Sequence, residues 1–280
     1  MAFTYDHIII GAGASGSHLA LAMLSDPYFE DKDVLIIERS EKKENDKTWS
    51  FWEDGSGKWD DIIYKQWRYA NVFGHQKEIK IDLETLRYKM LRSVDFYAHA
   101  RHQLKKAKPF TYVTEKVVQV KEVQNLVEVI TDDHQYKAKH VFDSRLPDIN
   151  KVKKGNATTI LQHFRGFFLK TDKATFDPER FTMMDYRLKD EDCTSFTYVL
   201  PIDEHRALVE FTYFTPKTVD QKRYDDHIDQ YLKEYLGDPN YKVEEIEQGI
   251  IPMSTYDFSQ HHSQRITKIG TAGGWVKASS

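Results

Sequence analysis

Apolar residues follow several different rhythms along this chain. Near the N-terminus, unbroken apolar runs at residues 8–10 and 34–37 are typical of buried strands in a parallel sheet, and residues 17–24 between them have a compact helical pattern. Over residues 82–106, apolar positions recur at spacings of three and four, which predicts one long amphipathic helix. The first third of the chain is therefore predicted to have the strand and helix succession of an α/β fold.

The remainder of the chain has the composition of β-structure. Short β-rich runs separated by polar turns predict a meander that returns to the main sheet, at residues 111–113, 116–120, 126–130 and 139–143. Strands of an antiparallel sheet are predicted at residues 161–169, 181–187, 195–201, 207–214 and 243–251. A predicted helix at about residues 219–236 interrupts that sheet and ends at the turn sequence of residues 237–240. A polar segment at residues 150–156 marks a predicted crossing between two domains.

Composition excludes several classes of function. With 280 residues, 40% of them hydrophobic, the chain can bury a sizeable core. The net charge of −4, from 40 basic and 44 acidic residues, gives no electrostatic reason to expect a nucleic-acid partner. Cys193 is the single cysteine, which excludes an internal disulfide framework, and no metal-ligand spacing is found. No signal sequence and no apolar run near the ~18 residues of a membrane span is present, so we expect a cytoplasmic protein with at most peripheral membrane contact.

The strongest motif is the glycine-rich turn after the first apolar run. Gly11 permits a tight turn, Gly13 lets the backbone approach a diphosphate, and Gly16 allows close packing of helix on strand. Glu38 ends the second apolar run about 20 residues later, where a carboxylate binds a ribose hydroxyl. Strand, turn, helix and acid in this order predict a dinucleotide-binding site at the helix N-terminus.

Two other segments are candidates for the same site. A predicted strand at about residues 265–269 leads into a second glycine-rich turn with Gly270, Gly273 and Gly274, which we expect to make a backbone contact with the nucleotide. Asp143 and Arg145 follow another predicted strand, and the carboxyl ends of strands face the ligand crevice in open α/β sheets. A salt-linked surface turn is the alternative for that pair.

Glu210 and Asp185 are the candidate acids. Alternation along the predicted strand puts Glu210 on one face with Leu208, Thr212 and Phe214, where burial would raise its pKa and allow it to act as a general acid. A glutamate on the wet face of a half-exposed sheet is the alternative. Asp185 is a second candidate, although Arg187 two residues on could hold it ionised.

The aromatic segment at residues 48–52 has no helical or alternating period. We expect a loop there that lines or covers a pocket, or else ordinary core aromatics beneath a long loop.

Seven motifs in order give the chain a family resemblance. It resembles the bacterial lycopene cyclases at residues 46–52 (DKTWSFW), 142–145 (FDSR), 184–187 (MDYR), 198–201 (YVLP), 208–212 (LVEFT), 249–253 (GIIPM) and 270–274 (GTAGG). The resemblance implies a Rossmann-type FAD-binding domain, built like those of aromatic hydroxylases and geranylgeranyl reductases, at residues 1–157 and 253–280. It implies an antiparallel β-sheet substrate domain at residues 158–252.

The same resemblance implies an activity. A glutamate matched by Glu210 protonates an acyclic carotene such as lycopene, the chain closes to a ring, and a proton is lost. Reduced FAD stabilises the carbocation without net hydride transfer, and NADPH is the reductant. The family pattern continues beyond the C-terminal glycines, so we expect this chain to be a fragment or a shortened form. A prenyl-chain reductase, an aromatic monooxygenase and a non-catalytic flavin-binding paralogue are the alternatives.

Overall fold

The computed structural model describes residues 3–147, 157–191 and 193–276. The chain divides into two compact units, and each unit combines separate stretches of sequence. Unit 1 contains residues 1–45, 93–158 and 254–280, and unit 2 contains residues 46–92 and 159–253. The predicted linker at residues 150–156 lies outside the described residues. Residues 46–92 were expected in the nucleotide-binding domain, but the structure assigns them to unit 2, where their strands pair with one another and with β13 (Arg180–Asp185).

Unit 1 is built on a sheet with the strand order β8-β2-β1-β11-β10-β9, in which β17 also pairs with β11. The parallel strands are β1 (Phe3–Ile10), β2 (Val34–Glu38), β8 (Phe110–Thr114), β11 (Gln135–Asp143) and β17 (Ile266–Lys268). β9 (Val117–Val123) and β10 (Leu126–Thr131) complete the predicted meander by antiparallel pairing. Every residue of β2 is buried, as its unbroken apolar run predicted. The Rossmann-type fold class is confirmed.

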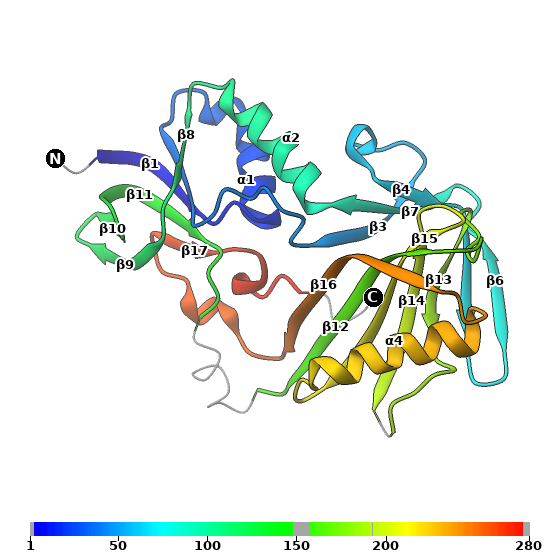
Figure 1. The fold of residues 1–280 in the computed structure, drawn as a ribbon. Helices are drawn as coiled ribbons and strands as arrows, with labels where there is room; N and C mark the ends of the chain where they lie inside the picture. The colour runs from blue at the N-terminus through cyan, green and yellow to red at the C-terminus, as the bar shows by residue number, and fades with distance from the viewer. Residues whose placement is uncertain (1–2, 148–156, 192, 277–280) are drawn as a thin grey trace. The chain divides into compact units, whose positions relative to one another are not determined.

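Two helices of unit 1 lie side by side next to this sheet: α1 (Ala14–Leu24) and α2 (Ser93–Lys105) (Figure 1). Short 3-10 helices are η1 (Pro27–Phe29), η3 (Phe258–His261) and η4 (Gly270–Gly273). The sequence predicted one helix over residues 82–106, and its first part is wrong. Residues 86–92 form a strand of unit 2 with four consecutive buried residues. Leu86 and Met90 are four positions apart, a spacing that also occurs in a helix, and this led to the wrong prediction.

Unit 2 contains the predicted antiparallel sheet, with the strand order β16-β12-β15-β14-β13-β5-β6. Its strands are β5 (Tyr69–Phe73), β6 (Glu78–Asp82), β12 (Thr159–Thr171), β13, β14 (Thr194–Pro201), β15 (Arg206–Thr215) and β16 (Tyr241–Ser254). The β13–β5 pair is parallel. A smaller antiparallel sheet has the order β3-β7-β4 and contains β3 (Thr48–Asp54), β7 (Leu86–Arg92) and β4 (Lys65–Trp67), with η2 (Asp60–Ile62) nearby in sequence. The aromatic segment at residues 48–52 is thus a strand and not a loop.

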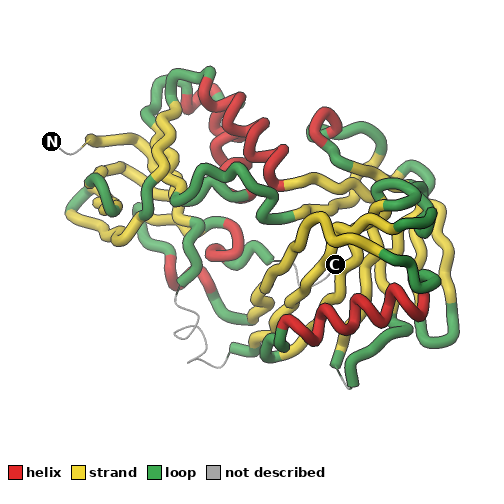
Figure 2. The backbone as a smooth tube through the Cα atoms, viewed as in Figure 1, coloured by secondary structure: helices red, strands yellow, loops and turns green. Residues whose placement is uncertain are grey.

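Helix α4 (Gln221–Tyr235) covers one face of the large sheet, as Figure 2 shows within unit 2. Its Ile228 and Tyr231 are buried against residues of β15 that alternate along the strand, including Val209 and Phe211. Because successive side chains of a strand point to opposite faces, Leu208 and Glu210 lie on the face away from α4. The helix therefore determines which face of β15 is available for chemistry.

Candidate functional site

The first candidate site surrounds the glycine-rich turn of unit 1. Gly11 has φ of +93°, and its N–H donates a 2.8 Å hydrogen bond to the carbonyl oxygen of Ile37. A Cβ on Gly16 would lie 1.9 Å from the carbonyl oxygen of Gly11. The chain's own turn and its helix packing therefore require glycine at both positions.

Gly13 is different, because the protein itself does not require it to be glycine. A Cβ on Gly13 would meet no atom within 4 Å, so the space in front of this residue is open. Gly13 is also the N-cap of α1, which has no side-chain cap and no acidic residue in its first turn. Open space beside uncapped helical N–H groups suits an anion such as a diphosphate.

Gly11 and Gly13 line a cavity of about 460 Å³. The other lining residues are Ile10, Ile37, Glu38, Arg39, Lys42, Glu115, Lys116, Val117, Ser144, Arg145 and Leu146. Glu38 is 5% exposed, and its Oε2 accepts a 2.7 Å hydrogen bond from the backbone N–H of Ala12. Because a carboxylate oxygen accepts more than one hydrogen bond, Glu38 can still receive a ribose hydroxyl. These residues fit the ribose and diphosphate of a dinucleotide.

The sequence left two alternatives for Asp143 and Arg145, a position at the ligand crevice and a salt-linked turn, and the structure shows features of both. Arg145 lines the cavity, and its guanidinium also donates hydrogen bonds of 2.9 Å to both carboxylate oxygens of Asp143. Lys268 of β17 donates to Asp143 Oδ2 at 2.8 Å. Burial alone would raise the pKa of Asp143, but Arg145 and Lys268 outweigh it and hold that pKa below its ordinary value. The pair fixes the end of β11 beside the cavity.

The C-terminal glycines pack against the start of α1. Gly270 has φ of +62°, and a Cβ there would lie 2.5 Å from Ser15 Oγ. A Cβ on Gly273 would lie 2.6 Å from the carbonyl oxygen of Lys268, and Gly274 has φ of +76°. None of the three is among the residues that line the cavity. Their close packing explains the glycines, and a contact with the nucleotide stays a prediction.

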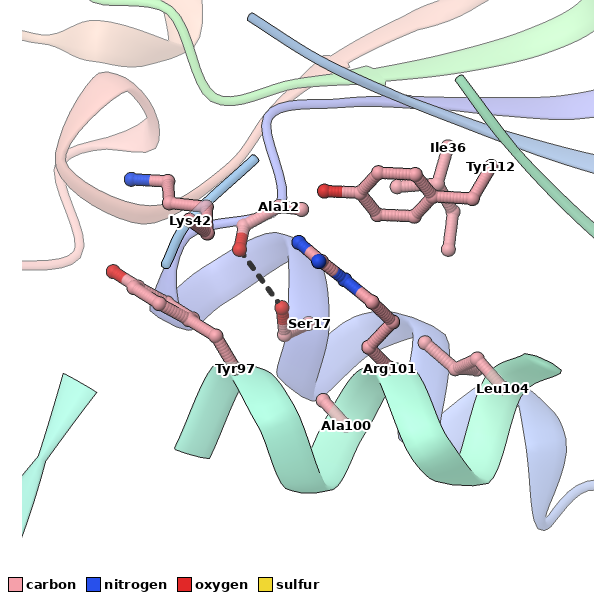
Figure 3. Close-up of a pocket in the computed structure, with 9 residues that line it drawn as sticks. All are labelled: Ala12, Ser17, Ile36, Lys42, Tyr97, Ala100, Arg101, Leu104 and Tyr112. Carbon is pink, nitrogen blue, oxygen red and sulfur yellow. Dashed lines mark hydrogen bonds between the residues drawn. The ribbon is translucent and has the colours of Figure 1, made fainter. Parts of the chain in front are cut away.

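A second, smaller hollow lies beside the same turn (Figure 3). There, Ser17 Oγ donates a 3.0 Å hydrogen bond to the carbonyl oxygen of Ala12. Arg101 of α2 extends toward Ala12, with its guanidinium 5.1 Å from the ring centre of Tyr112. Sequence reasoning did not single out Arg101, because a cation on an amphipathic helix is usually solvated.

The second candidate site is a cavity of about 250 Å³ within unit 2. Seven of its twelve lining residues are apolar or aromatic, and the other five, two of them glutamates, are polar. The residues are Thr48, Trp49, Ser50, Tyr88, Gln162, Phe164, Tyr198, Leu200, Leu208, Glu210, Glu247 and Ile251. Such a cavity suits an apolar ligand that reacts with an acid. Of the residues that the structure describes, no cluster could hold a metal ion.

Glu210 projects into this cavity from the face of β15 that the alternation predicted. Burial, together with the nearby charge of Glu247, raises the pKa of Glu210 from 4.5 to about 8. A 2.9 Å hydrogen bond from Thr212 Oγ1 and the charge of Lys47 oppose the rise without cancelling it. The carboxyl therefore keeps its proton at neutral pH, as a general acid requires.

Gly166 of β12 pairs with Glu210 across the sheet. A Cβ on Gly166 would lie 2.8 Å from Leu208 Cδ1 and 3.0 Å from Glu210 Cβ. The missing side chain therefore leaves space for the glutamate to extend along the sheet surface.

Asp185 does not join Glu210 in this cavity. It is fully buried, and Arg187 binds both of its carboxylate oxygens through Nε, at 2.9 and 3.1 Å. Tyr231 of α4 donates a further 2.7 Å hydrogen bond to Asp185 Oδ2. The expected pairing with Arg187 is thus present, but the contacts of Asp185 join the sheet to α4. This geometry does not support the catalytic role that the sequence suggested for it.

Glu247 of β16 is the acid that sequence reasoning missed. It is 5% exposed, lines the cavity with Glu210, and accepts a 2.8 Å hydrogen bond from the N–H of Thr48 at Oε1. In the sequence it belongs to a run with Glu244 and Glu245, which looks like a solvated strand face. Only its position two residues before the motif at residues 249–253 could have drawn attention to it.

Comparison with protein families identifies the chain. The model of the family described as lycopene cyclase protein matches residues 6–280. The chain belongs to the lycopene cyclase family. This membership confirms the resemblance that the seven motifs indicated. No curated protein sequence matches this lycopene cyclase family member.

Solved structures show the same fold at low sequence identity. A geranylgeranyl bacteriochlorophyll reductase-like protein from Thermoplasma acidophilum has a TM-score of 0.72 and 14% identity, covering 98% of this family member and 72% of that chain. The flavin-dependent brominase Bmp2 has a TM-score of 0.65 and 16% identity, with coverages of 96% and 72%. A flavoprotein/dehydrogenase from Cytophaga hutchinsonii has a TM-score of 0.60 and 12% identity, with coverages of 96% and 71%. The likeness shows a fold shared with flavin-dependent proteins.

Proposed function

We propose that this chain is an FAD-dependent lycopene cyclase that converts the acyclic ends of a carotene to rings without net oxidation or reduction. The observation that carries the proposal is the carboxyl of Glu210, which has a pKa of about 8 and lies in a largely apolar cavity. Membership of the lycopene cyclase family supports the substrate class. Lycopene is the substrate we expect, with a β-ionone ring as product.

Glu210 has the properties that the first step needs. A terminal trisubstituted alkene is a weak base, so the acid must be neutral, dry and close to the carbon that it protonates. The cavity is lined by the aromatic side chains of Trp49, Phe164 and Tyr198, which would limit contact with water and could attract the developing cation. Protonation by Glu210 then starts ring closure within the same cavity.

The cofactor in this proposal is FAD in its reduced form. Gly13 and the N-terminus of α1 would receive the diphosphate, and Glu38 would receive the adenosine ribose. Arg145, Gly270, Gly273 and Gly274 are proposed to complete the flavin seat. When bound, reduced flavin supplies negative charge that stabilises a carbocation, and NADPH would keep it reduced.

The proposed substrate also bears on where the protein acts in the cell. Lycopene dissolves in lipid, so we propose that the protein is cytoplasmic and contacts the membrane peripherally. Within the described residues, no helix is long and apolar enough to span a bilayer.

The test is anaerobic incubation with lycopene, FAD and NADPH, followed by mass and product analysis. A ring product of unchanged mass supports the cyclase. A gain of hydrogen would instead indicate a prenyl-chain reductase, and a gain of oxygen in air an aromatic monooxygenase.

A matched pair of variants assigns the acid. Glu210→Gln keeps the shape but lacks a transferable proton, so cyclisation should fall by a factor of about 10²–10⁴ while the fold and FAD binding persist. Glu204→Gln, an exposed position before the same strand, should leave the rate unchanged. Parent-like cyclisation by Glu210→Gln would show that another group is the acid.

A further inference from the structure

We propose that Glu247 is the proton acceptor of the cavity and removes the proton that the ring-closed cation must lose. This inference rests on the proposed cyclase function and extends it to a second residue. It is carried by the position of Glu247 beside Glu210 in one cavity and by an oxygen atom of Glu247 that has no hydrogen-bond partner among the described residues.

Three neighbouring strands bring the two glutamates together. β12 lies between β15, which carries Glu210, and β16, which carries Glu247. Gly166 of β12 pairs with Glu210 on one side. On the other side, Arg165 Nη1 donates a 2.9 Å hydrogen bond to Gln248 Oε1, and the Cβ position of Gly249 lies 2.6 Å from the ring of Phe164. These contacts place residues 247–249 beside residues 164–166, so we infer that Glu247 lies near Gly166, which has no side chain to separate the two glutamates.

The two oxygens of Glu247 have different surroundings. Oε1 accepts the hydrogen bond from the N–H of Thr48, which fixes the carboxyl against β3. Oε2 is buried, and within the described part of the chain it has no partner in hydrogen-bond geometry. A buried carboxylate oxygen left unsatisfied is costly, and a catalytic role is one explanation for its persistence. The unpaired atom belongs to a residue that lines the cavity, where a substrate proton could reach it.

The electrostatics agree with one proton shared between the pair. Burial raises the pKa of Glu247, with the contact to Thr48 and the charge of Lys47 opposing it, and the charge of Glu247 in turn raises the pKa of Glu210. Two carboxylates that line one cavity of low polarity do not both ionise readily. Glu210 in the acid form and Glu247 in the carboxylate form are therefore the working arrangement.

The reaction balances with these two groups alone. The carboxyl proton of Glu210 adds to the terminal double bond and leaves Glu210 as a carboxylate. The π electrons of an internal double bond form the new C–C bond and move the positive charge into the ring. A C–H bond next to that charge then breaks, its electrons form the ring double bond, and its proton goes to Glu247. Transfer of this proton back to Glu210 resets the site without any oxidant or reductant.

The experiment compares the parent, Glu247→Gln and Glu210→Gln in D₂O with lycopene and reduced FAD. Glutamine at 247 keeps an oxygen for the Thr48 hydrogen bond but is no base. We expect Glu247→Gln to cyclise at least tenfold more slowly, and to return lycopene that carries deuterium or a ring with a misplaced double bond. Glu210→Gln should show no deuterium exchange, and Glu247→Asp should recover the parent product in part. Glu244→Gln, on the exposed side of β16, is the control.

A second measurement does not depend on turnover. In ¹³C NMR titrations of labelled glutamate carboxyls, Glu247→Gln should lower the pKa of Glu210 relative to the parent. An unchanged pKa would overturn the pairing.

In the D₂O experiment, slower cyclisation by Glu247→Gln with the parent product and no deuterium in recovered lycopene would indicate a structural role for Glu247. A parent-like rate would also overturn the assignment. If the parent itself forms no ring, the proposed function fails, and the role of Glu247 fails with it.

Discussion

Tyr231 on α4 donates its hydroxyl hydrogen to the buried carboxylate of Asp185 on β13, with 2.7 Å between the two oxygens. Arg187 binds the same carboxylate and also lies over the ring of Tyr235, 4.3 Å from its centre. This network anchors the helix to the sheet on the face away from the Glu210 cavity. These contacts give Asp185 a structural role that does not require it to take part in proton transfer.

Asp185→Asn should therefore lower stability more than it changes chemistry. The amide cannot neutralise Arg187 and offers one oxygen in place of two, which should cost about 1–3 kcal/mol. Chemical denaturation measures that loss, and Tyr231→Phe should show a smaller loss of the same kind. Cyclisation per folded molecule should stay within a few fold of the parent. A hundredfold loss of activity in a stably folded Asp185→Asn protein would contradict this prediction and support a catalytic role for Asp185.

The raised pKa of Glu210 makes stability depend on pH in a defined window. The folded pKa of about 8 exceeds the ordinary value of 4.5, so the folded state holds this proton more tightly than the unfolded state. The contribution to stability is fully present below pH 4.5 and is lost as the pH rises toward 8. Over that range the loss can reach about 5 kcal/mol, less where water enters the cavity. Unfolding curves of the parent and of Glu210→Gln between pH 5 and 9 should diverge in this way, and parallel curves would contradict the raised pKa.

The cyclisation rate should depend on the same ionisation of Glu210. Glu210 donates only while protonated, so the cyclisation rate should fall as the pH rises through about 8. The pH dependence of single-turnover cyclisation at saturating FAD measures this. A rate that increases across the same range would point to a different rate-limiting ionisation.

Gly13 and Gly16 should respond differently to an added side chain. Gly16→Ala puts a Cβ 1.9 Å from the carbonyl oxygen of Gly11 and should destabilise the protein even without ligand. Gly13→Val meets open space, so the variant should fold normally, but its side chain occupies the diphosphate position. For the parent, FAD at a hundred times its dissociation constant should add about 2.7 kcal/mol to the free energy of unfolding. Thermal shift assays should show no such gain for Gly13→Val, and a parent-like gain would place the diphosphate elsewhere.

Membrane contact should be apolar in character. The protein should float with neutral liposomes, and moderate salt should leave most of it bound, because apolar insertion is little screened. Trp52 on β3 is 43% exposed, and residues of that strand line the cavity. Trp52→Ala should weaken flotation, whereas Trp275→Ala, 63% exposed in unit 1, serves as control. Binding that disappears in salt would indicate surface charge instead.

Local patterns predicted the glycine-rich turn between β1 and α1 well because its steric requirements lie within one short segment. Gly11 and Gly16 respond to steric limits between residues close in sequence, and the strand that delivers Glu38 is buried at every position. The strand from Leu86 to Arg92 was missed for the opposite reason. It is packed on both faces between residues 88 and 91, so it shows no alternation.

The partners of the acids depend on pairing between distant strands, which no local pattern reveals. Glu210 was found because its own strand alternates and because a family motif contains it. Glu247 was not found, since its burial depends on β3. The residues that begin this strand, 48–52, show no alternation that would predict a strand. Asp185 could be paired with Arg187 from the sequence, but the contact with Tyr231, 46 positions away, could not be foreseen.

The interleaving of the two units limits how this protein can be dissected. Each unit draws on stretches from both halves of the gene, and the chain passes between them near residues 45, 92, 158 and 253. Any single cut would deprive at least one sheet of strands, so one truncation cannot separate unit 1 from unit 2. Point variants such as Gly13→Val in unit 1 and Glu210→Gln in unit 2 are the practical means to perturb one unit while the other keeps its complete set of strands.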